Sequence, residues 1–220
     1  MFISLVAFSF GCDKGPDKPL TIAMNEWTGY QPLVYAHSMG YLNPNQVHLA
    51  TLGSTSASLI QFRAGNADAI TVTLDEALLL NSEGYDISIV LIMDISNGGD
   101  AIVSKPQIKT IHQLKGKRIA VENTAVGAYV LTRALQQANM SLSDIHPVPL
   151  SADKHINLFK LEDIDAVVTF EPTKTELNTQ GGHIVFDSSM IPNEIIDVLV
   201  INNAKLKTYR DELEHVIDAW

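Results

Sequence analysis

Residues 117–135 read KRIAVENTAVGAYVLTRAL, a short apolar strand pattern followed directly by a helical one. KRIAV predicts a strand, and the residues from Glu122 to Leu135 predict a helix. Small and hydroxyl-bearing residues, including Asn123 and Thr124, stand where the strand turns into the helix. Such a turn presents free backbone N–H groups to whatever lies in front of it. The stretch therefore predicts one strand–helix unit of an α/β fold, with a place to hold a small polar ligand.

Strand and helix patterns alternate from Leu20 onward in a first series. Short apolar or alternating runs predict strands, and runs with an apolar helical face predict helices. The predicted strands are 20–24, 47–52, 68–74 and 87–94, and the predicted helices are 32–42, 56–65 and 75–84. Gly65 and Gly84 stand where the last two of these helices should end. Repeated strand–helix–strand units predict a largely parallel sheet with helices on both faces.

A second series of the same kind follows. The predicted strands are 117–121, 147–150, 165–170, 183–187 and 197–202, and the predicted helices are 111–116, 122–135, 155–163, 173–180 and 207–220. Two extended segments flank this series, GGDAIVSK (98–105) and IIDVLVIN (195–202). We therefore expect two α/β domains, with these segments as crossovers, a ligand cleft between the domains and a hinge at the crossovers. The expected division assigns 20–100 and 198–220 to the first domain and 101–197 to the second.

The N-terminal residues 1–19 resemble a bacterial lipoprotein signal with its linker. An apolar run ends in Gly11-Cys12, and the polar stretch DKGPDKP follows. In a signal of this kind the cysteine is lipidated, so Cys12 is the expected lipidation site. No basic residue precedes the run, and Phe10 stands where such signals carry a small residue, so an incidental cysteine is the alternative. The run is too short to span a bilayer as a helix.

Composition and charge narrow the function classes. The 220 residues are 46% hydrophobic, which is enough for a substantial core, and the formal net charge is −10. Nucleic-acid binding needs clustered Lys and Arg, so we expect no such partner. Cys12 is the only cysteine, which excludes an internal disulfide. The histidines lack metal-ligand spacing, and HExxH, GxSxG, GxxxxGK[ST] and GxGxxG are absent. We therefore expect a protein that is not an enzyme, with neither metal nor cofactor.

Ligands of open α/β sheets bind beyond the C-terminal ends of the strands, so the loops at those ends are candidate sites. Trp27 and Tyr30 follow the first strand, where aromatic rings can form the floor of a small site. Core packing is the alternative. Ser54, Thr55 and Ser56 follow the second strand at a helix start, where they either cap the helix or hold a ligand oxygen. The turn in the opening stretch repeats this arrangement in the second series.

Acidic residues also stand at the predicted strand ends, namely Asp75, Asp94, Glu122 and Glu171. Few Lys or Arg residues occupy comparable positions. Carboxylates that line a cleft favour a ligand with an amine, an amidine or a ring N–H donor. The alternative is ordinary acidic charge at helix N-termini, which fits Asp75 best and Glu122 least.

Several blocks of sequence, in this order and spacing, make residues 20–220 similar to the substrate-binding proteins of ABC importers for nitrate, taurine, alkanesulfonates and thiamine pyrimidine precursors. The blocks are EWTGYQPLVYAHSMGYL, LGSTSASLIQFRAGNADAITVTLDEAL, GGDAIVSKPQIKTIHQLKGKRIAVENTAVGAYVLTRAL, DAVVTFEP and FDSSMIPNEIIDVLVIN. The resemblance implies a type II periplasmic-binding-protein fold, an α/β class with two domains, a ligand cleft and two crossover strands. Family members are usually longer, so we expect Trp220 to truncate the C-terminal part of the first domain.

The resemblance also implies a function and a location. The chain would be a monomeric solute-binding component that works with the membrane permease of an ABC importer. It would be periplasmic or at the cell surface, tethered to the membrane through a lipidated Cys12. The implied ligand contacts are Trp27, Tyr30, Ser54, Thr55, Ser56 and Asp94 from the first domain, and Glu122, Asn123, Thr124 and Glu171 from the second.

The acidic strand ends favour taurine or an aminopyrimidine over a purely anionic ligand such as nitrate. Two alternatives to transport stay open. One is a ligand-sensing domain of the same fold that feeds a signalling partner. The other is an enzyme like the fungal synthase of the thiamine pyrimidine, whose cysteine-rich motif this chain lacks.

Overall fold

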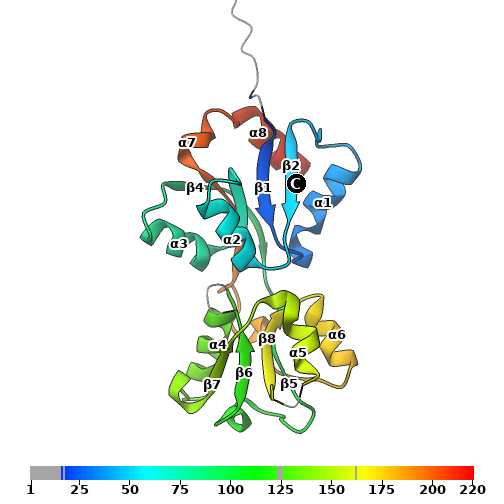
Figure 1. The fold of residues 1–220 in the computed structure, drawn as a ribbon, viewed down its shortest axis with the longest axis vertical. Coiled ribbons are helices and arrows are strands. Elements are labelled where there is room, and N and C mark those ends of the chain that lie inside the picture. Colours follow the sequence, from blue (N-terminus) through cyan, green and yellow to red (C-terminus); the bar gives the residue numbers. More distant parts are fainter. Residues whose placement is uncertain (1–15, 17, 123–125, 162) are drawn as a thin grey trace, which may run out of the picture.

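The chain folds into two α/β halves that lie one above the other in Figure 1. The computed structural model describes residue 16 and residues 18–122, 126–161 and 163–220. Within these ranges each half is built on a five-stranded sheet. The first domain contains the sheet β2-β1-β3-β10-β4, and the second contains the sheet β7-β6-β8-β5-β9. The two halves expected from the alternating patterns are both present.

The elements follow the predicted order closely. The first domain contains β1 (Leu20–Met24), α1 (Gln31–Ser38), β2 (Val47–Thr51), α2 (Thr55–Arg63), β3 (Ala69–Thr73), α3 (Leu74–Ser82), β4 (Ile87–Ile95), β10 (Ile196–Asn202), α7 (Asn203–Leu206) and α8 (Arg210–Ala219). The second domain contains β5 (Asp100–Ser104), β6 (Arg118–Val121), α4 (Val126–Gln137), β7 (His146–Pro149), α5 (His155–Phe159), β8 (Ala166–Phe170), α6 (Thr173–Thr179) and β9 (His183–Asp187).

Local sequence sets several helix ends. The Ser54 side chain accepts a hydrogen bond from the backbone N–H of Ala57 and so caps α2. Gly65 and Gly84 have φ of +73° and +93°, a left-handed conformation that ends α2 and α3 as predicted. The C-terminal helix predicted for 207–220 is present as α8, with a later start than predicted. The Asn202 side chain caps the separate short helix α7, and α8 begins only at Arg210.

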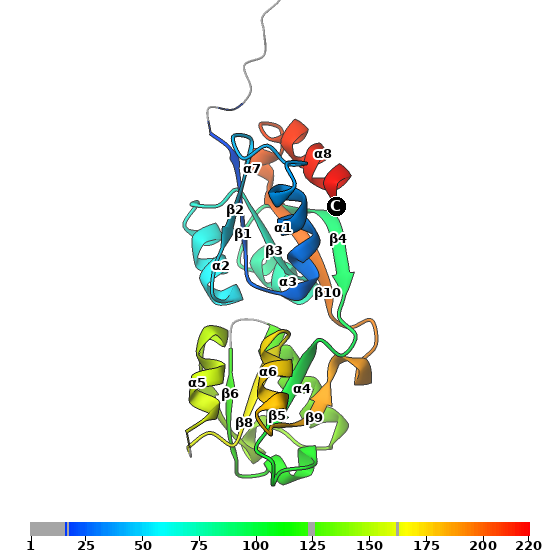
Figure 2. The same ribbon diagram turned by 90° about the vertical axis from the view of Figure 1, so that its right-hand side faces the viewer.

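Both sheets are largely parallel, as predicted, but each also contains one antiparallel strand. β1 pairs with β2 and β3 in parallel, whereas β10 is antiparallel to both β3 and β4. The second sheet repeats this plan, because β6 pairs in parallel with β7 and β8 while β5 is antiparallel to β8 and β9. β10 and β5 each enter their sheet from the opposite domain (Figure 2). They therefore begin at the edge where the parallel strands end, and they run the other way.

Apolar side chains cover both faces of each sheet. In the first domain, one cluster joins the strands to α1 and α8, and another joins them to α2 and α3. In the second domain, α4 packs on one face of the sheet, and α5 and α6 pack on the other. Each domain therefore has its own two-sided core, which is the layered arrangement typical of α/β proteins.

Two linkers join the domains, and they are bonded to each other. The link from β4 to β5 includes Ser96, and the link from β9 to β10 includes Ser188; their hydroxyl oxygens lie 2.9 Å apart. The Ser188 hydroxyl also accepts the N–H of Gly98 at 2.7 Å, and the N–H of Ser96 bonds the carbonyl of Ile195 at 3.0 Å. A hinge between the domains would have to turn about this joined pair of linkers.

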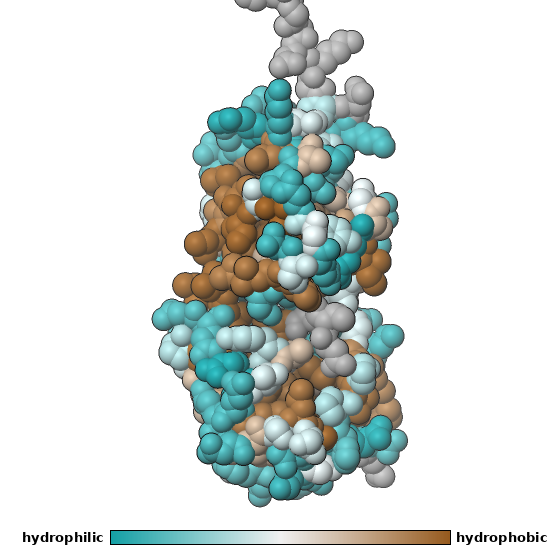
Figure 3. Space-filling view, turned by 90° about the vertical axis from the view of Figure 1, so that its left-hand side faces the viewer, coloured by the Kyte–Doolittle hydropathy of each residue, from teal (hydrophilic) through white to brown (hydrophobic). Residues whose placement is uncertain are grey.

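One face of the first domain is strongly apolar. The edge strand β4 exposes Ile89, Ile92 and Ile95, and hydrophobic residues gather on the upper half of the face in Figure 3. An edge strand with exposed apolar side chains is typical of a contact surface. Across the part of the chain that the structure describes, no helix is both long and apolar enough to cross a membrane.

Candidate functional site

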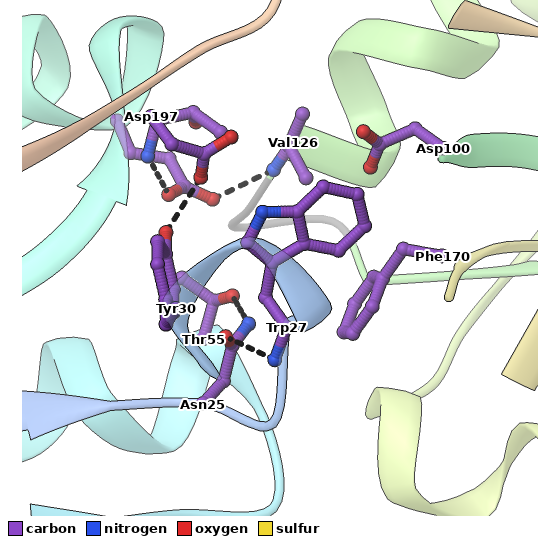
Figure 4. A pocket seen from close by; sticks show the side chains of 10 residues that line it. Asn25, Trp27, Tyr30, Thr55, Asp100, Val126, Phe170 and Asp197 are labelled. Carbon is purple, nitrogen blue, oxygen red and sulfur yellow. Dashed lines mark hydrogen bonds between the residues drawn. The ribbon is translucent and has the colours of Figure 1, made fainter. Parts of the chain in front are cut away.

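A small cavity lies between the two domains, at the edge where the parallel strands end (Figure 4). The space open to the centre of a water molecule is about 20 Å³, which is room for about one water. The lining residues are Asn25, Trp27, Tyr30, Thr55, Thr73, Glu76 and Asp197 from the first domain, and Asp100, Val126 and Phe170 from the second. An organic molecule can enter this site only if the domains move apart.

Trp27 is the main aromatic residue of the cavity, and it is held on several sides. Its indole N–H donates to Asp94 Oδ2 at 2.9 Å, and its backbone N–H donates to Asn25 Oδ1 at 3.1 Å. Its ring meets Phe170 of the second domain edge-to-face, with centroids 6.0 Å apart and planes at 82°. A Cβ on Gly99 would lie 2.3 Å from the ring. The Trp27 ring is therefore fixed by groups from both domains.

Tyr30 and Asp197 form a buried pair beside Trp27. The Tyr30 hydroxyl donates to Asp197 Oδ1 at 2.6 Å, and Figure 4 shows the two side chains directed at each other. Burial raises the pKa of the Asp197 carboxyl well above its ordinary value, and the negative charge of Asp94 adds to this shift. Asn25 donates to the Thr55 hydroxyl at 2.7 Å, which ties the loop after β1 to the start of α2.

Two further acids of the lining are deeply buried. Burial raises the pKa of Glu76 to about 8, with a further rise from the charge of Asp75. Burial also raises the pKa of Asp100 to about 6; a hydrogen bond from Ser96 opposes the rise. The cause is the loss of solvation that a carboxylate suffers in a dry site. Among the described residues that line the cavity, none is a Lys or an Arg.

Each domain has a glutamate side chain that accepts a hydrogen bond from a helix N-terminus of the other domain. Glu122, at the end of β6, accepts the backbone N–H of Ser56 in the first turn of α2 at 3.0 Å. In the opposite direction, Glu76 of α3 accepts the backbone N–H of Val126, where α4 begins, at 2.7 Å. Glu76 also accepts the N–H of Thr73 at 2.9 Å. Each domain therefore supplies a carboxyl group to an N–H group at a helix N-terminus of the other.

A second, smaller cavity adjoins the first in the second domain. It has about 10 Å³ open to the centre of a water molecule, and it shares Asp100, Val126 and Phe170 with the first cavity. Two of its other lining residues are His155 and Thr169. They are 1% and 3% exposed, and neither His155 Nδ1 nor Thr169 Oγ1 has a hydrogen-bond partner within the described chain.

The protonation of His155 follows from its surroundings. Its Nε2 lies 3.3 Å from the carbonyl oxygen of Leu150, and a carbonyl can only accept. Burial lowers the pKa of His155 to about 4, so the ring is neutral at pH 7. Nε2 therefore carries the proton, and Nδ1 presents a lone pair.

The candidate residues from the sequence fall into three groups. Trp27, Tyr30 and Thr55 line the first cavity, and Glu122 lines the second. Three further candidates support these residues. Ser54 caps α2, Ser56 donates its N–H to Glu122, and Asp94 accepts the indole N–H of Trp27. Asp75 and Glu171 are not among the lining residues; Glu171 bonds Thr175 at the start of α6 and pairs with Lys174. Asn123, Thr124 and Cys12 lie outside the described residues.

Several lining residues were not among the candidates. They are Asn25, Thr73, Glu76, Asp100, Val126, Phe170 and Asp197 in the first cavity, and His155 and Thr169 in the second. Asp100 and Asp197 lie near the starts of antiparallel strands. They are therefore not at strand C-terminal ends, where the candidate residues were expected. Glu76 lies next to the candidate Asp75, and their shared position at a strand end does not distinguish the two. The described residues contain no group of three or more His, Cys, Asp or Glu that could hold a metal ion.

Gly99→Ala should displace the Trp27 ring, because the new Cβ would lie 2.3 Å from Cη2 and 3.1 Å from Cζ3. We expect a loss of about 1 to 3 kcal/mol in unfolding free energy and a shifted Trp27 emission. Denaturant unfolding and fluorescence in a Trp220→Phe background measure both. Gly53→Ala is the matched control, since its nearest neighbour is Asp153 Cβ at 3.3 Å. Equal behaviour of the two variants would contradict the packing described.

The buried acids should make the ligand-free protein less stable as pH rises from 5 to 8. A carboxyl with a raised pKa keeps its proton in the folded state but loses it in the unfolded state near its ordinary value. For Glu76 that window runs from 4.5 to about 8, and for Asp100 from 3.8 to about 6. Glu76→Gln should flatten the fall in melting temperature, whereas Glu214→Gln on exposed α8 should not. A melting temperature that rises from pH 5 to 8 would refute this account.

Known proteins share this architecture. The alkanesulfonate-binding protein SsuA from Xanthomonas axonopodis pv. citri, bound to MOPS, superposes with a TM-score of 0.82 at 19% identity, over 94% of this chain and 72% of that one. The periplasmic nitrate-binding protein NrtA from Synechocystis PCC 6803 gives 0.74 at 13% identity, over 94% and 62%. A Candida albicans protein described as having the generic periplasmic binding protein fold gives 0.70 at 15% identity, over 91% and 69%. The predicted fold class is confirmed.

Sequence comparison leads to the same group of proteins. A curated Escherichia coli (strain K12) protein, named as an aliphatic sulfonates-binding protein, is 30% identical over 81 residues. That match covers 37% of this chain and only 25% of the relative's length. The NMT1-like family matches residues 13–220, which is almost the whole chain. The resemblance to ABC-importer binding proteins is therefore confirmed, and the chain belongs to the NMT1-like family.

Proposed function

We propose that this chain is the solute-binding component of an ABC importer, and that it captures a small nitrogen- or sulfur-containing organic ligand between its two domains. The observation that carries the proposal is the cavity at the strand ends, to which both domains contribute lining residues. Because a ligand there would touch both domains, it would favour the closed form over the open one. The names of the similar proteins, which refer to sulfonate and nitrate binding, support this reading.

The proposed ligand contacts follow from the geometry. Trp27, Tyr30 and Thr55 would touch the ligand from the first domain, and Glu122 from the second. Asp94 and Ser54 would act indirectly, by holding Trp27 and the start of α2. Nothing in this set resembles a nucleophile activated by a base, so we propose that the ligand is bound without being transformed.

The partner and the location are part of the same proposal. The partner would be a membrane permease that recognises the closed form. The protein would act as a monomer in the periplasm or at the cell surface, with Cys12 as a lipidated tether. These expectations rest on the similarity to importer proteins and on the N-terminal sequence, since Cys12 lies outside the described residues.

A thermal-shift screen tests the binding function. The panel would contain taurine, alkanesulfonates, nitrate, thiamine and its pyrimidine precursors, amino acids and polyamines. A ligand at 100 times its Kd should raise the melting temperature by about 5 to 10 °C, because it binds only the folded state. Trp27→Ala should weaken binding at least about tenfold, whereas Tyr41→Ala, at an exposed site, should not. A cooperatively unfolding protein that responds to no compound would count against capture of this ligand group.

Closure can be tested separately in the absence of ligand. Glu122→Ala removes the acceptor that reaches across the cleft to the Ser56 N–H. Because this bond joins the two domains, its loss should shift the protein toward open forms with a larger radius of gyration. Small-angle X-ray scattering measures the change, and Glu214→Ala on α8 is the control. An unchanged radius in both variants would show that the carboxylate contact does not hold the domains together.

A further inference from the structure

We infer that the ligand of this cleft carries a positively charged nitrogen with several N–H donors, such as an amine or an amidine, and that Glu76 and Glu122 exclude anionic ligands. The inference rests on the proposed function, because it names the class of molecule that the binding protein captures. It reverses the charge suggested by the names of the similar sulfonate- and nitrate-binding proteins.

The first support is the balance of charge in the two cavities. Carboxyl groups of Glu76, Asp100, Glu122 and Asp197 line them, and no Lys or Arg does within the described residues. Lys174 is the nearby cation whose charge acts on Asp100, but its Nζ donates to the carbonyl of Gly98 at 2.6 Å and lies 3.3 Å from Glu171. An anion in this cleft would face several carboxyl groups without a described counter-charge in the lining, whereas a cation would be paired.

The second support is the use of the helix N-termini. Backbone N–H groups at a helix start are the natural site for a sulfonate, nitrate or carboxylate group. Here the N–H of Ser56 in α2 is bonded by Glu122, and the N–H of Val126 in α4 is bonded by Glu76. An anionic ligand would have to displace these two acidic side chains from the N–H groups that they occupy. The two side chains therefore each occupy one N–H group that could otherwise bind an anion.

The third support is independent of the acids, and it comes from an acceptor that lacks a partner. His155 Nδ1 presents a lone pair, because Nε2 lies against the carbonyl of Leu150. Thr169 Oγ1 is also unpartnered within the described chain, but a hydroxyl can donate as well as accept, so only His155 Nδ1 requires a donor. Both residues are almost completely buried at the second cavity. A buried acceptor without a donor costs free energy, so this geometry favours a ligand that brings N–H groups.

The aromatic residues are consistent with a flat cation. Trp27, Tyr30 and Phe170 line the first cavity, and Trp27 and Phe170 come from opposite domains. Aromatic faces attract a planar charged group such as an amidinium. The same rings would accept an uncharged ring equally well, so the carboxylates decide the sign of the ligand's charge.

Benzamidinium and benzenesulfonate provide a matched pair of probes, since they share a ring and differ in charge. Isothermal titration of the full chain should show binding of benzamidinium and at least about tenfold weaker binding of benzenesulfonate. Asp100→Asn should weaken benzamidinium binding about 10- to 100-fold, because a charged acceptor is lost. Asp211→Asn in α8 makes the same charge change outside the lining and should leave both affinities unchanged.

Glu122→Ala tests the exclusion of anions directly. The variant exposes the N-terminus of α2 and removes one negative charge, so benzenesulfonate should bind at least about tenfold more tightly than to the parent chain. Glu214→Ala should cause no such gain. Circular dichroism and cooperative unfolding establish that each variant is folded. A folded Glu122→Ala protein with unchanged sulfonate affinity would overturn the exclusion role.

The outcomes separate this inference from the proposed function. If the probes and screened compounds that bind are amines or amidines, the inference stands. If a sulfonate or nitrate binds and no cation does, the importer function stands but the ligand class is overturned. If no probe and no screened compound binds a cooperatively folded chain, both are overturned.

Discussion

The rest of the structure depends on two antiparallel strands, β10 in the first domain and β5 in the second. The chain enters each of these strands directly from the other domain. β10 enters the first sheet and β5 enters the second at the edge where their parallel neighbours end. Their first residues are therefore brought beside the last residues of the parallel strands. Asp197 pairs with Thr73, and Asp100 pairs with Phe170. The antiparallel placement of these two strands thus joins the domains, forms the cleft and places carboxyl groups in it.

Buried carboxyl groups are costly, and the contacts around them show how the fold tolerates them. Tyr30 donates to Asp197, and the helix N-termini of α2 and α4 donate to Glu122 and Glu76. Because the two helix contacts cross between domains, the cost is met only while the domains stay together. Burial still raises the pKa of Glu76 to about 8, so the N–H contacts of this side chain offset its desolvation only in part. The part of the desolvation that is not offset opposes closure, and a ligand that supplies positive charge would relieve it.

Much of this could be predicted from the sequence, and the residues that were missed depend on how elements pack against one another. The parallel strand–helix units, the helix ends at Gly65 and Gly84 and the placement of Trp27 and Thr55 follow from local pattern. Asp100 and Asp197 could not be found this way, because an antiparallel strand places its first residues where the parallel strands place their last. Which of Asp75 and Glu76 faces the cavity depends on the phase of α3 against its neighbours, and sequence spacing does not fix that phase.

The contacts of Glu122 show how one fold can be adapted to ligands of opposite charge. A helix start that faces a cleft offers N–H groups, and it attracts an anion whatever the rest of the site contains. A carboxylate supplied by the opposite domain accepts one of those N–H groups, as Glu122 does from Ser56, and leaves its second oxygen as an acceptor. The positive end of the helix is thereby covered by a negatively charged side chain, without any change in the backbone. In the proposed site, the acidic side chains of the cleft therefore decide the sign of the ligand's charge, while the two-domain fold decides where the ligand binds.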